Sequence, residues 1–328
     1  MKMPNNNYNV HLFTIGGVNY GFGHIARLIP IYDIFNTNGL SPIFYVDGDD
    51  TVSRLLKNKR YLITDWLNEK VLSIKESDIV IIDSLIFPLD FFEKLKFNTS
   101  NIFFISDDYI DEHFPAKIIN WRVNSNTHHN QANNLNGEEF VPLRQEIIKY
   151  RNYKKNENEV IISMGGNDVL NLIHPTIEVL LNEFGDTLKI KAIISKNHKE
   201  FSNIVSKYGK EITFLYDLNA NQLFREMAGA EFAIASGGHT IYEFAYLGTP
   251  VVHVLLVDNQ KPALEWNKTH FTYPIGWYNP KTYSKNIIEG VRFFLKPDNL
   301  NKAKVIGQKL IDDKGAQRIF QHITNNQL

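Results

Sequence analysis

The sequence predicts an α/β protein built from two doubly wound, Rossmann-like domains that face a central cleft. Short β-branched runs alternate with helical patterns in both halves of the chain, and this alternation is typical of βα units around a parallel sheet. Apolar strands also run into glycine-rich turns that open helices, at residues 10–28, 160–168 and 232–243. Because ligands of such sheets bind at the carboxyl ends of the strands, each half is expected to contribute to a site.

Residues 1–150 are predicted to form the N-terminal domain. Its expected strands are apolar along their whole length, as strands covered on both faces are. They lie at residues 10–15, 43–46, 79–82, 102–105 and 118–120. The stretch at residues 149–159 is charged and poor in apolar residues, which is typical of a linker between domains.

Residues 159–300 are predicted to form the C-terminal domain, and residues 301–328 to add one or two closing helices. The expected strands are at residues 160–164, 190–194, 212–215, 232–235 and 251–254, and the expected helices between them include residues 170–184, 222–228 and 240–247. The last of these helices should end at Gly248, because glycine caps a helix and the proline that follows at position 250 cannot continue it.

Composition excludes several classes of protein. A length of 328 residues with 43% hydrophobic residues suits two domains of roughly 150 residues each. A net charge of -1 without a long basic run argues against a nucleic-acid partner. The absence of cysteine excludes disulfides and thiol catalysis. We expect a soluble, cytoplasmic protein without a membrane span, metal or cofactor; the oligomeric state stays open.

The first glycine-rich turn presents Gly21, Gly23, His24 and Arg27. Its backbone N–H groups at the positive end of a helix would bind phosphate oxygens. His24 stands where this helix begins, with glycine on its amino side, so we expect a neutral, uncovered imidazole that acts as a base. The alternative is a histidine that only caps or packs the turn. Arg27 is either a phosphate clamp or a solvated residue of the first helical turn.

Residues 21–26 also fit the loose G-x-G-x-x-A fingerprint of dinucleotide-binding domains, and Asp47 follows the next strand as a ribose-binding acid would. A nicotinamide-dependent dehydrogenase is therefore a minor alternative. Five residues, 16–20, precede the first fingerprint glycine, where the dinucleotide fold needs a tight turn. The acidic run at residues 47–50 is predicted to be an exposed turn rather than a metal site.

The glycine-rich turn of the second half is the stronger signal. Gly237, Gly238 and Thr240 would receive a diphosphate at the start of a helix. Glu243, one turn further on, would accept hydrogen bonds from ribose hydroxyls. His239 would either donate to a phosphate oxygen or pack.

Further polar residues follow other predicted strands of the second half. Gly165, Gly166 and Asn167 are expected to line the same cleft, and the amides of Asn259 and Gln260 to bind sugar hydroxyls. With anion-binding turns in both domains, the sequence indicates an enzyme that holds a phosphorylated ligand.

Asp107 and Asp108 follow the predicted strand at residues 102–105 of the first half. At the carboxyl end of that strand they would border the cleft. They are candidates for a catalytic or acceptor-orienting role, with turn formation as the alternative.

These motifs occur in an order that resembles the nucleotide-sugar enzymes of the GT-B fold. The resemblance spans residues 10–270 and rests on the motifs at residues 21–27, 163–168, 243–250 and 259–260. The chain is most similar to the PseG family of UDP-aminosugar hydrolases and more distantly to MurG-type glycosyltransferases. The resemblance implies that His24 acts at the anomeric carbon of a sugar. It also implies that the loop at residues 237–238, with the glutamate that follows, holds the nucleotide.

One departure from the PseG pattern concerns the reaction. PseG enzymes carry Asp-His-Tyr after a central strand, with a tyrosine that helps to position water, whereas this chain has Asp83-Ser84-Leu85. The prediction is therefore an inverting, metal-independent glycosyltransferase with a UDP-aminosugar donor and a sugar or glycan acceptor. The main alternative is a PseG-type hydrolase, in which water replaces the acceptor.

Overall fold

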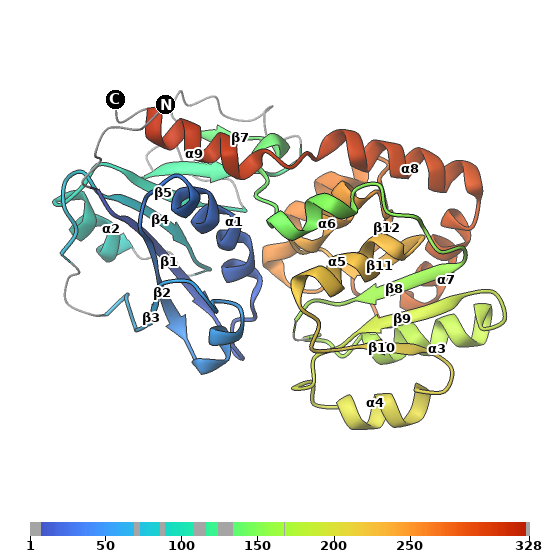
Figure 1. Cartoon of the computed structure of the whole chain (residues 1–328). Helices are drawn as coiled ribbons and strands as arrows, with labels where there is room; N and C mark the ends of the chain where they lie inside the picture. Colours follow the sequence, from blue (N-terminus) through green and yellow to red (C-terminus); the bar gives the residue numbers. More distant parts are fainter. Residues whose placement is uncertain are drawn as a thin grey trace. The chain divides into compact units, whose positions relative to one another are not determined.

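The chain folds into two compact α/β units, shown in the computed structural model of Figure 1. The first comprises residues 1–144 with 314–328, and the second comprises residues 145–313. The structure describes residues 8–68, 73–85, 89–107, 116–123, 134–166 and 168–325. The chain therefore enters the second unit once and returns to the first for its last helix.

The sheet of the first unit has seven strands within the described residues, in the order β3-β2-β1-β4-β5-β6-β7, and every pairing is parallel. The strands are β1 (Val10–Gly16), β2 (Pro42–Gly48), β3 (Tyr61–Ile63), β4 (Ile79–Asp83), β5 (Ile102–Ile105), β6 (Lys117–Asn120) and β7 (Leu135–Asn136). The chain leaves β1 toward β2 and later returns to its other side as β4. The switch point of this sheet therefore lies between β1 and β4.

Helices cover both faces of this sheet. In the described part of the chain the helices of this unit are α1 (Gly23–Thr37), η1 (Asp50–Arg54), α2 (Leu89–Lys96), η3 (Glu138–Phe140) and α9 (Gly315–Asn325). On one face Phe13 and Val80 pack with Phe92 of α2. The other face carries α1, and Figure 1 shows α9 beside it.

The last helix, α9, belongs to the first unit although α8 (Pro297–Leu310) belongs to the second. Phe320 of α9 packs its edge against Phe35 of α1, with 5.1 Å between ring centroids. Gly315, the first residue of α9, lies close to the backbone at Val141. A Cβ at position 315 would be 2.0 Å from the Val141 carbonyl oxygen, so only glycine fits there. The segment predicted to add one or two closing helices thus contains the end of α8, in the second unit, and α9, in the first.

The second unit repeats the architecture. Its sheet has six parallel strands among the described residues, in the order β10-β9-β8-β11-β12-β13. The strands are β8 (Glu159–Ser163), β9 (Lys189–Ile193), β10 (Thr213–Leu215), β11 (Phe232–Ser236), β12 (Val251–Leu255) and β13 (Thr272–Trp277). The switch point here lies between β8 and β11.

The helices of the second unit include the ones predicted. They are η4 (Gln145–Tyr150), α3 (Ile173–Phe184), α4 (Phe201–Tyr208), α5 (Ala220–Gly229), α6 (Thr240–Leu247), η5 (Asp258–Lys268), α7 (Tyr283–Phe294) and α8. Gly248 ends α6 in the left-handed conformation at φ 62°, as the sequence predicts. The prediction of two doubly wound, parallel-sheet domains is confirmed.

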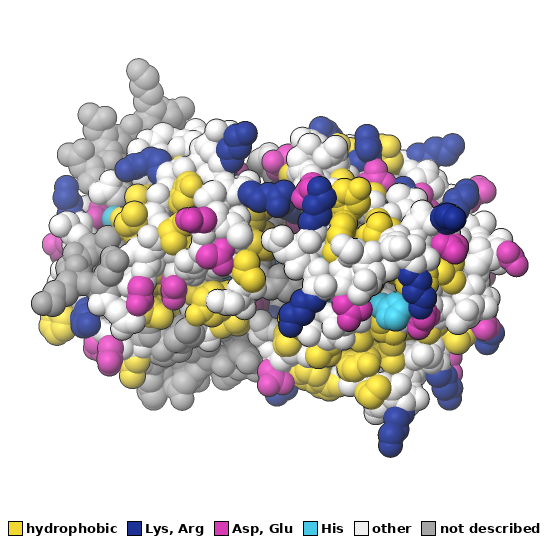
Figure 2. All heavy atoms as spheres, turned by 90° about the horizontal axis from the view of Figure 1, so that it is seen from below, with side chains coloured by type: hydrophobic (Ala, Val, Ile, Leu, Met, Phe, Trp, Pro, Cys, Tyr) yellow, Lys and Arg dark blue, Asp and Glu magenta, His cyan; other side chains and the backbone are white. Residues whose placement is uncertain are grey.

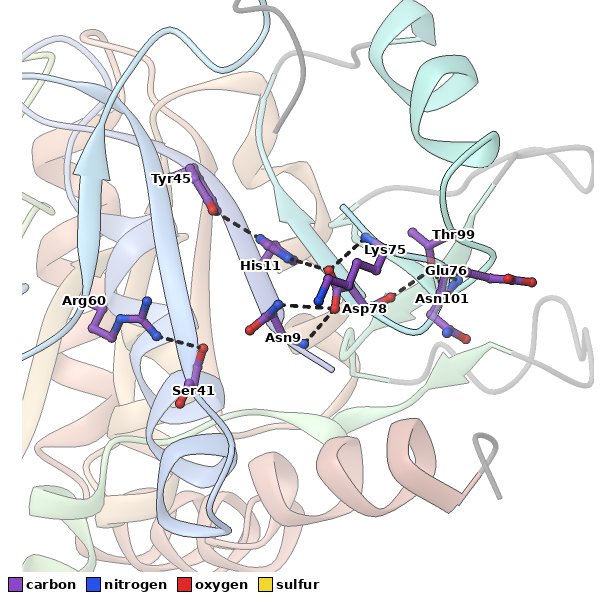
Figure 3. A network of polar contacts seen from close by, with 10 residues as sticks. All are labelled: Asn9, His11, Ser41, Tyr45, Arg60, Lys75, Glu76, Asp78, Thr99 and Asn101. Atoms are coloured by element: carbon purple, nitrogen blue, oxygen red, sulfur yellow. Dashed lines mark hydrogen bonds and ion pairs between the residues drawn. The ribbon is translucent and has the colours of Figure 1, made fainter. Parts of the chain in front are cut away.

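A polar network lies where strands β1 and β4 of the first sheet begin (Figure 3). Asp78, which is fully buried, accepts hydrogen bonds from the backbone N–H groups of Asn9, at 2.7 Å, and Lys75, at 2.9 Å. Its carboxylate also contacts Nε2 of His11, at 3.2 Å, and Nδ1 of that ring meets the Tyr45 hydroxyl. Burial alone would raise the pKa of Asp78, but these hydrogen bonds lower it.

Replacing Asp78 by Asn should destabilise the protein by about 1–3 kcal/mol at pH 7, because the amide N–H₂ would face one of the backbone N–H donors that Asp78 now accepts from. The ionised carboxylate contributes to the free energy of unfolding at pH values above the ordinary Asp pKa of about 4. This contribution is lost as the pH falls through the lowered pKa of Asp78 in the folded protein. Urea unfolding of the wild type and Asp78→Asn from pH 7 to 3 should therefore give curves that converge in acid. Asp90→Asn, at an exposed position, should leave stability unchanged.

Candidate functional site

A buried histidine–carboxylate pair occupies the switch point of the first unit. His24 is the second residue of α1, and Asp83 is the last residue of β4. Nδ1 of His24 lies 2.7 Å from Oδ1 of Asp83. Burial alone would raise the pKa of Asp83, but the charges of Arg27 and His24 and their hydrogen bonds lower it to about 2. Asp83 is therefore ionised throughout the neutral range.

Arg27, one turn after His24, joins two carboxylates. Its Nε donates to Oδ2 of Asp83 and its Nη2 donates to Oδ1, both at 2.6 Å. Its Nη1 donates to Oδ2 of Asp107, also at 2.6 Å. Burial alone would lower the pKa of Arg27, but Asp107 and Asp83 raise it above its ordinary value. The guanidinium also lies over the Trp121 ring, 5.4 Å from its centroid, so its position is fixed from several sides.

The contacts of His24 select one tautomer. Nδ1 is 2.7 Å from the Asp83 carboxylate and 3.3 Å from Nη2 of Arg27. A carboxylate only accepts hydrogen bonds and a guanidinium only donates them. Nδ1 would have to be protonated to bond Asp83 and unprotonated to bond Arg27, so it cannot bond both. The shorter, charge-assisted contact assigns the proton to Nδ1. In this tautomer of the neutral ring Nε2 carries the lone pair, and Nε2 has no hydrogen-bond partner in the described part of the chain.

Asp83 was the functional residue that the sequence analysis did not select. The sequence feature that could have indicated it is that Asp83 is a single carboxylate at the end of an otherwise apolar strand, β4. The register of the sheet pairs Thr14 of β1 with Asp83, which places the carboxylate beside the turn that leads to His24. Asp107 does join this cluster, through Arg27, whereas Asp108 lies outside the described residues.

The second switch point carries the turns that follow β8 and β11. Gly165 has a left-handed φ of +82°, and a Cβ there would lie 3.5 Å from Oγ of Ser236. Gly166 is exposed, and Asn167 lies outside the described residues. Asp168 accepts hydrogen bonds from two backbone N–H groups that precede or open α3, at 2.8 and 2.9 Å. This carboxylate therefore anchors the glycine turn to a helix.

The two glycines after β11 differ in their surroundings. A Cβ on Gly237 would lie 2.6 Å from Leu255 and 3.1 Å from Cβ of Ala263, so this glycine is required for packing. A Cβ on Gly238 would meet no atom within 4 Å. In the first unit Gly23 is equally open, while Gly21 has a φ of +75°. Gly23 and Gly238 thus leave open space beside the first turns of α1 and α6.

The remaining predicted residues surround the start of α6. Thr240 is its first residue, and His239 packs against Tyr242 with 5.5 Å between ring centroids. Glu243 is buried within α6.

Asn259 and Gln260 lie in η5, directly after β12. Asn259 is exposed. Oε1 of Gln260 accepts from the backbone N–H of Leu256 at 2.8 Å, which fixes the turn. These two amides therefore stand at the carboxyl edge of the sheet, as do the turns after β8 and β11.

No protein-family model matches the chain. An uncharacterised protein of Methanocaldococcus jannaschii is 25% identical over 268 residues, which cover 74% of this chain and 54% of that protein. A Helicobacter pylori protein described as pseudaminic acid cytidylyltransferase and UDP-2,4-diacetamido-2,4,6-trideoxy-beta-L-altropyranose hydrolase is 23% identical over 252 residues, 73% of this chain and 43% of that protein. The chain spans about half the length of these curated relatives.

Solved structures match nearly the whole chain. S. aureus MnaA in complex with UDP has a TM-score of 0.66 at 14% identity, covering 97% of both chains. Acinetobacter baumannii MurG has a TM-score of 0.65 at 11% identity, covering 97% of this chain and 99% of that one. UDP-GlcNAc 2-epimerase of Neisseria meningitidis, bound to UDP-GlcNAc, has a TM-score of 0.60 at 12% identity, covering 96% and 100%.

The chain therefore has the GT-B fold. Among the described helices, none is both long and apolar enough to cross a membrane. Basic and acidic side chains are interspersed on the face drawn in Figure 2, in keeping with a net charge of -1.

The tautomer of His24 can be tested without a substrate. Long-range ¹H–¹⁵N spectra of the neutral imidazole should show a protonated Nδ1 and an unprotonated Nε2. Asp83→Asn should change this pattern, because an amide that donates to Nδ1 favours the other tautomer. The spectrum of His174, a half-buried residue of the second unit, should not change in this variant. A protonated Nε2 in the wild type would contradict the assignment.

The two glycines of the second unit form a matched pair. Gly237→Ala should lower stability by about 1–3 kcal/mol, because the added methyl group overpacks the contact with Leu255. Gly238→Ala should change stability by less than about 0.5 kcal/mol. Thermal and urea unfolding of both variants measures this difference. Equal losses would show that Gly238 also has a packing role.

Proposed function

We propose that the protein is an inverting glycosyltransferase that uses a nucleotide diphosphate sugar, specifically a UDP-aminosugar, as its donor. The observation that carries the proposal is the buried His24–Asp83 pair, whose geometry leaves Nε2 of the histidine ready to accept a proton. A general base is what an acceptor hydroxyl needs in order to attack an anomeric carbon. The GT-B fold supports a nucleotide sugar as the other reactant.

In the proposed reaction, Nε2 of His24 takes the proton of the acceptor hydroxyl. The hydroxyl oxygen forms a bond to the anomeric carbon as the bond from that carbon to the diphosphate breaks, which inverts the configuration. Asp83 holds the ring in position and stabilises the imidazolium that forms. Arg27 and Asp107 act through Asp83, because Arg27 binds both carboxylates.

The second unit would hold the nucleotide. The first-turn amides of α6 would receive the diphosphate, with Thr240 and His239 beside it, and the open space at Gly238 allows a phosphate to approach the backbone. Gly165 and Gly166 would border the same ligand. Such amides stabilise the departing diphosphate, so the proposal requires no metal ion.

Sugar contacts complete the proposed donor site. Glu243 would accept hydrogen bonds from ribose hydroxyls, and Asn259 and Gln260 would contact the sugar. The solved GT-B structures of MnaA with UDP and of the N. meningitidis epimerase with UDP-GlcNAc support UDP as the nucleotide of this chain's donor.

Hydrolysis is the second candidate. The H. pylori relative is described as including a UDP-sugar hydrolase. In that reaction His24 would activate water instead of a hydroxyl group. The chain has Ser84 and Leu85 after the central carboxylate, in place of the His and Tyr of the PseG pattern, so we favour transfer.

The test is UDP release from a panel of UDP-aminosugars, with and without sugar acceptors, and anomer-resolved NMR of the product. We expect release that depends on an acceptor and a product of inverted configuration. His24→Ala should lower kcat by about 10²–10⁴-fold, and Asp83→Asn should also lower it strongly. His174→Ala, at a half-buried position of α3 in the second unit, is the control.

Each outcome of this assay assigns a reaction. Rapid release of free sugar without acceptor would make the protein a hydrolase. Near-normal turnover by His24→Ala would exclude this histidine as the base. No release from any donor would overturn the proposal of a UDP-aminosugar enzyme.

A further inference from the structure

The segment between β1 and α1 forms a small closed loop, residues 17–21, which we call the tip loop. Gly17 and Gly21 pair across it: each donates its N–H to the carbonyl of the other, at 3.0 and 2.8 Å. Both have left-handed φ values, +110° and +75°, which only glycine adopts readily. Residues 17–20, which separate β1 from Gly21, therefore belong to an ordered element at the switch point.

Asp49, just after β2, anchors this loop from outside. Its Oδ2 accepts from the N–H of Val18 at 2.7 Å, and its Oδ1 accepts from the N–H of Thr51 at 3.0 Å. The hydrogen bonds from Thr51 and Val18 lower the pKa of Asp49. A Cβ on Gly17 would lie 2.4 Å from the carboxylate, so glycine permits the contact. The predicted acidic turn thus supports the loop that precedes His24.

The tip loop exposes apolar side chains beside the proposed base. Val18 is 52% exposed and Tyr20 is 39% exposed. Leu85, two residues after Asp83, is 50% exposed at the same edge of the sheet. These exposed apolar side chains, on a loop held by hydrogen bonds, offer apolar surface that a ligand can cover. Because the loop leads directly into α1, that ligand would also meet His24.

We propose that Val18 and Tyr20 determine which sugar reacts at His24, and that Asp49 is a positioning residue that holds them there. This inference rests on the proposed function. An aminosugar pyranose has C–H faces, N-acetyl methyl groups and hydroxyls. A tyrosine ring can pack against the C–H faces and methyl groups, and its hydroxyl can form a hydrogen bond with a sugar hydroxyl. A preformed loop binds such a ligand with little loss of conformational entropy.

Steady-state kinetics of tip-loop variants test the recognition step. Tyr20→Ala should raise the KM for the sugar substrate by about tenfold, with kcat changed less than about threefold, because the ring contributes binding and not chemistry. Val18→Ala should raise KM less. Tyr20→Phe should raise KM by an amount between the wild type and Tyr20→Ala, because the ring stays and only the hydrogen bond of its hydroxyl is lost. The matched control is Tyr61→Ala, on β3 of the same unit, whose side chain is 37% exposed.

The positioning role of Asp49 has its own readout. Asp49→Asn should accelerate hydrogen exchange of the Val18 amide, measured by NMR, and should raise KM as Tyr20→Ala does. Asp50→Asn, at the exposed neighbouring carboxylate, should change neither. Faster exchange in Asp49→Asn with an unchanged KM would overturn the link between the loop and the sugar.

Failure of this inference differs from failure of the proposed function. If the wild type turns over a UDP-aminosugar and His24→Ala does not, but Tyr20→Ala behaves like Tyr61→Ala, the tip loop does not recognise the sugar while the proposed function stands. If the wild type turns over no donor of the panel, the proposed function fails and this inference fails with it.

Discussion

The arrangement of the first unit depends on the buried ion pair between Arg27 and Asp83. A carboxylate without exposure to water would be protonated if it had no partner. The two hydrogen bonds from the guanidinium, both at 2.6 Å, instead keep it charged. That charge selects the tautomer of His24. Removing one member of such a pair typically costs about 3–5 kcal/mol, so the geometry of the site and the stability of the unit depend on the same contact.

The two units use one fold in two ways. In the first unit, the switch point gathers carboxylates, a guanidinium and an imidazole, and this chemistry suits proton transfer. In the second, the switch point carries glycine turns and helix N-termini, which suit an anion. Gly23 and Gly238 occupy related places, each open and each beside the start of a helix.

The sequence predicted most of the sheets because strands buried on both faces are apolar throughout. It did not predict β3 and β7, which are edge strands of three and two residues, or β13, which contains Pro274 and Gly276. His24 and Arg27 were found because the glycine turn precedes them. Their carboxylate partner is set by the pairing of β1 with β4, which no local pattern contains. Likewise, the packing role of Gly237 depends on side chains that follow it by more than fifteen residues.

The return of α9 to the first unit means that the second unit is an insertion into the first. Residues 145–313 form a continuous piece, so this unit can fold as soon as the ribosome has released it. The first unit begins earlier but finishes later, because Phe35 meets Phe320 only after the last helix has been made. The second unit can therefore be complete before the first, although its synthesis starts later.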